Sequence, residues 1–294
     1  MKVAVVGGGL WGQALSKLVQ AAGNEVLLGV TGRKPRRKIP NTRDLAEAGD
    51  FAELVLLATG PAALKSALVE LKLGPQHRVV VCTRGLQEHH GVWSTRLVQA
   101  TTPALRAGVL AGPAHSTEVL EGKPCAVVVA SEHASVCALT QSALHGPRCR
   151  VYTSNDPRGV ELAGAMTRVV SVAVSLADRM HLGPGARGLV VSRGLAEAVR
   201  LAEAMGVGTS AFFGLAGVGD IVATIGDPSH PAMLAGLQSD SEPIIAARAA
   251  LSAGQRLGVD MPLTEAVVAV AAGRIQPAEA LTWLMAREVK AGER

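Results

Sequence analysis

A short glycine-rich segment near the start of the chain has the composition of a phosphate-binding turn. Residues 7–12 read GGGLWG and contain the spacing G-x-G-x-x-G, between the β-branched run Val3–Val6 and the helical pattern Gln13–Ala22. In such a turn the first glycine allows a tight bend, the second lets a pyrophosphate approach the backbone, and the third lets helix and strand pack closely. The helix N-terminus then offers free N–H groups to phosphates. The turn predicts a dinucleotide site whose cofactor contacts are Gly7, Gly9, Leu10, Trp11 and Gly12.

The second predicted strand, Glu25–Val30, is followed by basic residues. A protein that binds NAD usually carries an acidic residue about 20 positions after the turn, where it binds the ribose 2′-hydroxyl. Glu25 opens the strand and so stands at the wrong end, and the next acidic residue is Asp44. Arg33 and Lys34 come just after the strand, and such cations can pair with the 2′-phosphate of NADP. NADP is therefore favoured over NAD; the alternative is that the basic segment is a solvated loop.

The elements that must position this turn follow from the periodicity of the chain. Short β-branched runs alternate with helical patterns in the first half, which is typical of βαβ units and a parallel sheet. The predicted strands are Val3–Val6, Glu25–Val30, Leu54–Ala58, Val79–Cys82, Gly108–Leu110 and Ala126–Ala130, with Arg150–Tyr152 as a last short one. From about Asp156 onward helical spacing dominates. The predicted helices there are Val160–Met180, Ala186–Met205, Ile244–Leu257, Thr264–Ala272 and Pro277–Lys290. The sequence predicts an α/β Rossmann-type doubly wound sheet over residues 1–154 and an all-α domain over residues 155–294.

The composition is that of a folded protein with a large core. Hydrophobic residues make up 48% of the chain and charged residues 18%, which argues against disorder. The apolar runs are far shorter than the roughly 20 residues of a membrane span, and no signal-peptide hydrophobic region precedes the glycine turn, so we expect a cytoplasmic protein without a membrane segment. The formal net charge of +5 suits a phosphate-bearing ligand, although scattered surface cations explain it equally well. No basic patch is interleaved with aromatic residues, so nucleic acid is not an expected partner.

The cysteine and histidine positions do not indicate a metal site. The four cysteines are Cys82, Cys125, Cys137 and Cys149. They lack the paired short spacing of zinc frameworks and do not suggest a disulfide scaffold. Cys82 and Cys125 lie in apolar runs and are predicted to be buried small hydrophobic residues. His89, His90 and His133 have no partners at metal-ligand spacing.

Four further segments carry a resemblance to a known family. They are Gly112–Val119 (GPAHSTEV), Ser192–Glu197 (SRGLAE), Gly214–Asp220 (GLAGVGD) and Asp260–Glu265 (DMPLTE). Together with the glycine turn they extend in order from residue 1 to about residue 285. The chain resembles the bacterial NAD(P)-dependent glycerol-3-phosphate dehydrogenases. The resemblance implies hydride transfer between a nicotinamide and carbon 2 of dihydroxyacetone phosphate or sn-glycerol 3-phosphate. It also implies a small phosphorylated substrate, a homodimer, no metal, and a helical domain that serves substrate binding and dimerisation.

The resemblance also implies a set of site residues, and several of them differ from the family pattern. Asp220 and Thr224 match the active-site Asp and Thr of the family. Its Lys-Gly after the fourth strand is Arg84-Gly85 here, and its Lys-Asn pair is Thr167-Arg168. The family's phosphate-gripping Arg-Asn pair is absent from a stretch that contains Pro228–Pro231, and its Val-Glu-Gly segment near residue 242 is not recognisable. The predicted catalytic residues are Asp220, Thr224, Thr167, Arg168 and Arg84.

These differences concern proton transfer. In the family the lysine at the position of Thr167 is the proton donor and acceptor, whereas threonine has no usable acidity and arginine stays charged. Reduction of a ketone needs an acid for the developing alkoxide. Arg168 can instead act electrostatically or clamp a phosphate, and His115 is of a type suited to proton transfer at neutral pH, although a lone loop histidine is usually a surface residue. Two functions stay open: an oxidoreductase of this type, or a dinucleotide-binding sensor or scaffold with little or no turnover.

Overall fold

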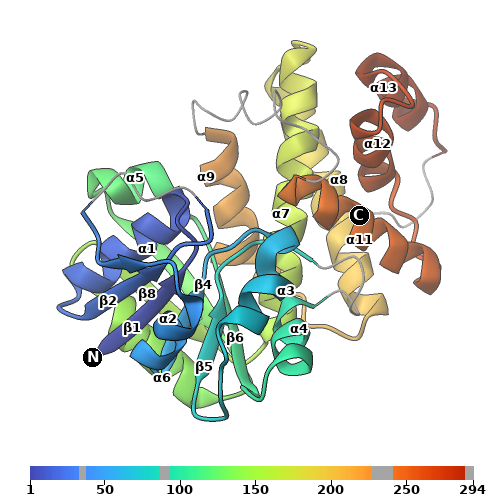
Figure 1. The fold of residues 1–294 in the computed structure, drawn as a ribbon. Coiled ribbons are helices and arrows are strands. Elements are labelled where there is room, and N and C mark those ends of the chain that lie inside the picture. Colours follow the sequence, from blue (N-terminus) through green and yellow to red (C-terminus); the bar gives the residue numbers. More distant parts are fainter. Residues whose placement is uncertain (33–37, 87–92, 227–240, 289–294) are drawn as a thin grey trace.

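The N-terminal unit is a mixed sheet covered by helices on both faces (Figure 1). The computed structural model describes residues 1–32, 38–86, 93–226 and 241–288. Eight strands lie in the order β3-β2-β1-β4-β5-β6-β7-β8. Their bounds are β1 Lys2–Val6, β2 Glu25–Gly29, β3 Asn41–Thr42, β4 Leu54–Leu57, β5 Arg78–Val81, β6 Arg106–Ala111, β7 Cys125–Ala130 and β8 Cys149–Ser154. The seven predicted strands are all present, and the two-residue β3 is an addition at one edge.

Alternate residues of the strands enter two different hydrophobic cores. The helices are α1 Leu10–Ala21, α2 Leu45–Phe51, α3 Pro61–Glu70, α4 Ser94–Thr101, α5 Ser116–Glu121 and α6 Ala134–Leu144. On β1, Val3 and Val5 pack into the core beneath α1 and α6, whereas Ala4 and Val6 pack into the core beneath α2 and α3. Continuous apolar runs are needed because both faces are covered. The predicted doubly wound Rossmann-type sheet is therefore confirmed.

The directions of two strands differ from the prediction of a parallel sheet. β7 runs antiparallel to β6, with Val109 opposite Ala130, and β8 runs parallel to β7. A parallel connection must cross back over the sheet, whereas the link between β6 and β7 carries just the short helix α5 and returns along the same edge. The N-terminal ends of β7 and β8 consequently lie at the edge where β1, β4, β5 and β6 end.

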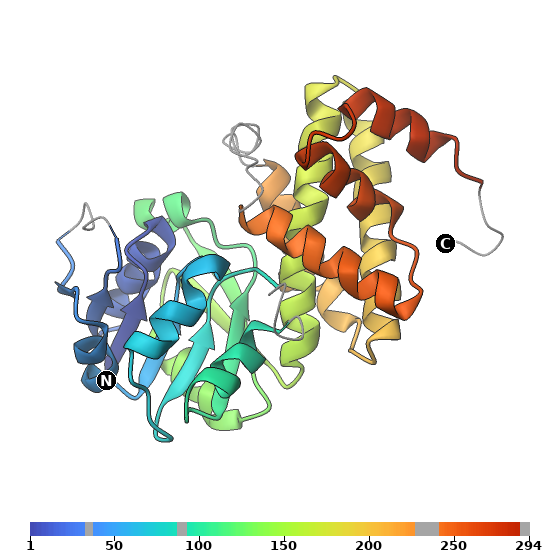
Figure 2. The ribbon, with the colours of Figure 1, turned by 45° about the vertical axis from the view of Figure 1, so that its right-hand side comes forward.

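The C-terminal unit is helical (Figure 2). Its long helices are α7 Pro157–Arg179, α8 Gly183–Ala204, α11 Glu242–Leu257, α12 Pro262–Ala271 and α13 Pro277–Met285. The five predicted helices overlap these. Between α8 and α11 the chain also forms the 3₁₀ turn η1 Ser210–Phe213, the π-helical turn η2 Leu215–Gly219 and the short helix α9 Asp220–Gly226, which the sequence does not predict because glycine disfavours helix. By length and composition α7 could span a membrane, but 89% of its most apolar window is buried inside the fold, so it is a core helix.

The two units share one hydrophobic core. The cluster contains Val109, Ala111 and Val128 from the sheet together with Leu162, Met166 and Val169 from α7. The predicted boundary between residues 154 and 155 falls between the end of β8 and the start of α7.

A buried glutamate on α7 also joins the units. Glu161 accepts hydrogen bonds from the backbone N–H of Ser94 and, at 2.9 Å, from the hydroxyl of Thr95. It therefore supplies hydrogen-bond acceptors to the first turn of α4 from a helix that is distant in the sequence. Burial raises the pKa of Glu161 to about 7, against the opposing effect of these donors.

Candidate active site

The glycine turn links β1 to α1 and leaves open space beside one of its residues. Gly7 has a φ of +126°, and an added Cβ there would lie 2.5 Å from the carbonyl oxygen of Ala58. An added Cβ at Gly12 would overlap the carbonyl oxygen of Gly7. At Gly9, by contrast, an added Cβ would meet nothing within 4 Å. Two glycines are thus needed for packing, while Gly9 borders open space.

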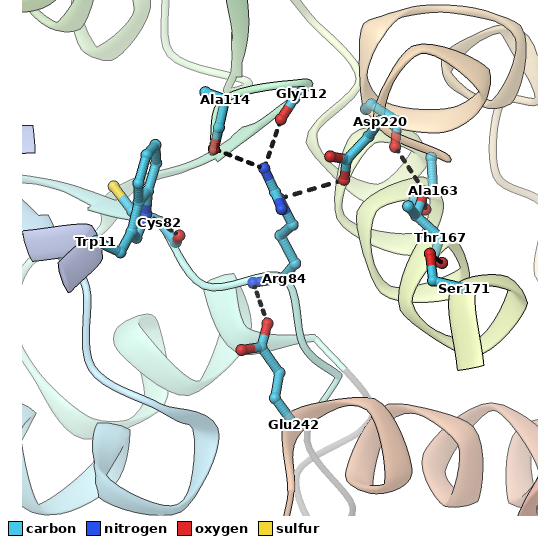
Figure 3. A network of polar contacts seen from close by, with 11 residues as sticks. Trp11, Cys82, Arg84, Gly112, Ala114, Ala163, Thr167, Ser171, Asp220 and Glu242 are labelled. Atoms are coloured by element: carbon cyan, nitrogen blue, oxygen red, sulfur yellow. Dashed lines mark hydrogen bonds and ion pairs between the residues drawn. The ribbon is translucent and has the colours of Figure 1, made fainter. Parts of the chain in front are cut away.

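A cavity of about 220 Å³ opens next to this turn. It is lined by Trp11, Ala58, Gly60, Cys82, Thr83, Arg84, Ala114, His115, Ser116, Arg168 and Glu242. The indole N–H of Trp11 donates to the carbonyl oxygen of Cys82 at 2.8 Å, which fixes the ring as one wall (Figure 3). The lining combines the carboxyl edge of the sheet with α7 and α11. Ligands of open α/β sheets bind at this edge.

Arg84 lies at the centre of the polar network and connects the two units (Figure 3). Its guanidinium donates to the carbonyl oxygens of Gly112 at 2.5 Å and Ala114 at 3.4 Å, and its Nε lies 3.3 Å from Oδ2 of Asp220. Its backbone N–H donates to Oε1 of Glu242 at 2.9 Å. Arg84 therefore holds the loop after β6 and the start of α9 in fixed positions.

Asp220 is the first residue of α9 and is fully buried. Neither of its carboxylate oxygens has a hydrogen-bond partner within the described part of the chain, although the Arg84 ion pair is close. Burial raises the pKa of Asp220 to about 7, and the charges of Arg168 and His115 oppose this shift.

Arg168 is a second cation at the cavity. It lines the cavity from α7, and its buried Nε makes no hydrogen bond to any described residue. Burial raises the pKa of both Asp220 and Glu242, and the charge of Arg168 opposes this rise. A guanidinium in this position has donors available for the oxygens of an anionic ligand.

Thr167 does not line the cavity. Its hydroxyl is buried and donates to the carbonyl oxygens of Ala163 at 2.9 Å and Ala216 at 3.1 Å, so it ties α7 to η2 (Figure 3). Thr224 is also fully buried, and its Oγ1 has no partner among the described residues. The structure thus brings Arg84, Arg168 and Asp220 together. Arg84 and Arg168 line the cavity, whereas Asp220 and the two threonines do not.

Glu242 is a cavity residue that the sequence analysis missed. It begins α11, its carboxylate accepts the backbone N–H of Arg84, and burial raises its pKa. The one signal available was an acidic residue before Pro243 at the start of an apolar helix.

Other predicted residues have a less central position or lie outside the described residues. Leu10 is 53% exposed. Arg33, Lys34 and Pro228–Pro231 lie outside the described residues. Across the described ranges no group of three or more His, Cys, Asp or Glu side chains could hold a metal ion.

Comparisons with known proteins agree with this architecture. The family model described as the NAD-dependent glycerol-3-phosphate dehydrogenase N-terminus matches residues 30–137, and the corresponding C-terminus model matches residues 156–282. A glycerol-3-phosphate dehydrogenase (NAD(P)+) of Methylibium petroleiphilum is 36% identical, with 99% of this chain and 98% of the relative covered. The enzyme of the same name from Synechococcus elongatus is 33% identical, with 98% and 97% covered.

Solved structures show the same fold. The glycerol-3-phosphate dehydrogenase of Coxiella burnetii matches with a TM-score of 0.88 at 24% identity, covering 97% of this chain and 99% of that one. A D-mandelate dehydrogenase in complex with NADH matches with a TM-score of 0.67 at 15% identity, covering 93% and 98%. The curated relatives bear the name of an enzyme, which favours the dehydrogenase hypothesis over a sensor or scaffold. On its near-full-length similarity to these relatives and on the two matching models, the chain belongs to the NAD-dependent glycerol-3-phosphate dehydrogenase family.

Proposed function

We propose that the protein is an NAD(P)-dependent oxidoreductase that interconverts dihydroxyacetone phosphate and sn-glycerol 3-phosphate. The observation that carries this proposal is the cavity lined by Trp11, from the end of the glycine turn, and by the cations Arg84 and Arg168. The relatives carry the corresponding enzyme name over nearly their whole length. In this proposal residues 1–154 hold the dinucleotide, and residues 155–294 complete the substrate site.

The open space at Gly9 and the indole wall of Trp11 fit a dinucleotide. Gly7, Gly9 and Gly12 would hold its pyrophosphate at the start of α1, and Trp11 would contact the bound cofactor. A reduced nicotinamide dinucleotide, when bound, supplies a hydride.

The chain's own residues have distinct roles in this proposal. Arg168 binds the anionic group of the substrate, because its Nε is not engaged by the described protein. Arg84 is a positioning residue that is already engaged by Gly112, Ala114 and Asp220. Asp220 forms an ion pair with Arg84, and both Asp220 and Thr224 are buried outside the cavity lining.

The proton for the developing alkoxide must come from a residue other than Thr167, whose hydroxyl is committed to Ala163 and Ala216. Among the described residues that line the cavity, His115 and Glu242 carry side chains that commonly transfer protons in enzymes. Without a lysine at position 167, we expect slow turnover of dihydroxyacetone phosphate together with normal binding of NADPH.

The test compares the protein with three variants, Thr167→Lys, Arg168→Asn and the double variant, by following NADPH consumption with dihydroxyacetone phosphate. The double variant restores the family's Lys-Asn pair and should raise kcat, measured at saturating dihydroxyacetone phosphate, by about 10²-fold or more, provided that the substrate still binds. Arg168→Asn alone should raise KM, because it removes the anion-binding guanidinium. Each variant is first checked for unchanged NADPH binding.

Two results would contradict parts of this scheme. Brisk turnover by the unmodified protein would show that another acid serves, and His115→Asn would then be the first variant to assay. Absence of turnover in all four forms would count against dehydrogenase activity itself, whatever the identity of the acid.

The proposed cofactor preference is for NADP. Its support is the sequence after β2, where Arg33 and Lys34 follow a strand without a terminal acidic residue. We expect NADPH to bind at least about tenfold more tightly than NADH, roughly 1.4 kcal/mol. Charge reversal at Arg33 and Lys34 should remove the difference in affinity between NADPH and NADH. Lys65→Glu on α3 is a matched control that should leave this difference unchanged. Equal affinities in the unmodified protein, measured by fluorescence titration, would show that the basic segment is simply solvated.

The proposal includes a cytoplasmic homodimer. Exposed apolar side chains on the helical unit support dimerisation, since Leu189 on α8 is 51% exposed and Val222 on α9 is 60% exposed. Their chain neighbours Val190 and Ile221 belong to one small hydrophobic cluster.

A further inference from the structure

Two cysteines that are 24 positions apart in the sequence become neighbours in the sheet. Cys125 and Cys149 open β7 and β8 and are register partners in this parallel pair. Register partners on adjacent parallel strands point to the same face. Cys125 and Cys149 are therefore adjacent across the β7–β8 pair.

The geometry permits a covalent link between them. Neighbouring strands lie about 4.8 Å apart, which is within the range of about 4.4–6.8 Å spanned by Cα atoms of disulfides. Both cysteines are free thiols in this structure. β8 is the edge strand of the sheet, so just one of its sides is held by a neighbouring strand.

One member of the pair is accessible and the other is not. Cys125 is half-buried, whereas Cys149 is buried. The neighbouring Cys149 thiol also lowers the pKa of Cys125, against the effect of its burial. A thiolate that is reachable from solvent is the reactive form of cysteine, and a second thiol beside it can resolve the oxidised product.

The pair lies at the functional edge of the sheet. Because β7 is antiparallel to β6, its first residues lie beside the segment that follows β6. An added Cβ at Gly112 would lie 3.1 Å from the carbonyl oxygen of Ala126, the residue after Cys125. The carbonyl oxygen of Gly112 in turn accepts a hydrogen bond from Arg84 in the candidate active site.

We propose that Cys125 and Cys149 form an oxidation site, at which a peroxide converts the two thiols into an intramolecular disulfide beside the cofactor edge. The Cys125 thiolate attacks one peroxide oxygen, the O–O bond breaks, and the released hydroxide takes a proton to become water. The resulting sulfenic acid is attacked by the Cys149 sulfur, which forms the S–S bond and releases a second water as the thiol gives up its proton. Two thiols lose two electrons, and one hydrogen peroxide is reduced to two waters. A dithiol reductant reverses the change by thiol–disulfide exchange.

The experiment treats the reduced full-length protein with hydrogen peroxide and analyses it by non-reducing peptide mass spectrometry. We expect a monomer lighter by two hydrogen atoms, a peptide linking Cys125 to Cys149, and a fall from four titratable thiols to two after denaturation. Dithiothreitol should restore all four thiols.

Two variants give matched comparisons. Cys137→Ser removes a thiol whose contacts are the carbonyl oxygens of Val129 and Ser154, so the linked peptide should still form. Cys149→Ser should stop the reaction at a Cys125 sulfenic acid that dimedone traps. The peptide map of the unmodified protein decides the matter even where a variant does not fold. Four persistent thiols, a link between other cysteines, or Cys125 sulfinic acid without the linked peptide would each overturn the proposal.

Discussion

At the residue scale, the three glycines of the turn have unequal physical roles. Gly7 and Gly12 are required by the backbone that surrounds them, whereas Gly9 has an ordinary φ of −66° and open space where a side chain would go. The spacing of the motif identifies all three positions, but their different roles become visible in the packing around them.

This difference gives a paired prediction. Gly9→Val should retain the fold and lose NAD(P)H binding, because its side chain would occupy the space for the pyrophosphate. Gly12→Val should instead unfold or destabilise the protein, since its Cβ would overlap the carbonyl of Gly7. Circular dichroism and fluorescence titration of both variants would check this. Undiminished cofactor binding by Gly9→Val would contradict the dinucleotide site.

The candidate site shows how far single residues can be predicted. Arg84, Arg168 and Asp220 were predicted because each stands at a motif position of the family. Glu242 was not, since the segment around it has diverged, and its contact with Arg84 joins residues 158 positions apart. A contact of that kind leaves no periodic signal in the sequence.

At the element scale, the strands and long helices follow from apolar periodicity, whereas strand direction does not. An apolar run is the same whichever way it is paired, so the antiparallel β7 could not be predicted from Ala126–Ala130 alone. The π-helical turn η2 and helix α9 were missed because GLAGVGD is rich in glycine, and tertiary contacts with α7 overcome the weak local propensity.

Glu161, which links α7 to α4, makes the free energy of unfolding depend on pH. Burial raises the pKa of Glu161 to about 7 from an ordinary 4.5, so the folded protein holds this proton more tightly than the unfolded chain. The contribution of Glu161 to the free energy of unfolding is therefore fully present below pH 4.5 and is lost as the pH rises through about 7. The shift corresponds to roughly 3 kcal/mol at about 1.4 kcal/mol per pH unit.

Urea unfolding of the protein and of Glu161→Gln across this pH range tests the link. The free energy of unfolding of the unmodified protein should fall relative to that of the variant as the pH rises, by up to about 3 kcal/mol. Glu203→Gln changes an exposed residue of α8 and should follow the unmodified protein. Parallel curves for the unmodified protein and Glu161→Gln would show that this carboxyl does not titrate across the range.

At the scale of the whole molecule, the helical unit should carry the dimer interface. Sedimentation velocity should show a dimer at micromolar concentration, and Leu189→Glu with Val222→Glu should shift it toward monomer by placing charges in an apolar contact. Leu105→Glu, at a position that is 61% exposed before β6 in the other unit, is the matched control and should remain dimeric. A monomeric unmodified protein would refute dimerisation, and a dimer that survives both charges would place the interface elsewhere.

The core shared by the sheet and α7 has a consequence for the order of synthesis. The ribosome releases the chain from its N-terminus, so every strand through Ser154 is made before α7 exists. Until then the face that carries Val109, Ala111 and Val128 lacks its cover. A nascent chain paused at the end of β8 would expose these apolar side chains, and chaperones bind surfaces of this kind. The N-terminal unit can therefore bury this face once α7 has left the exit tunnel. The speed of translation across residues 155–179 sets how long the face stays exposed.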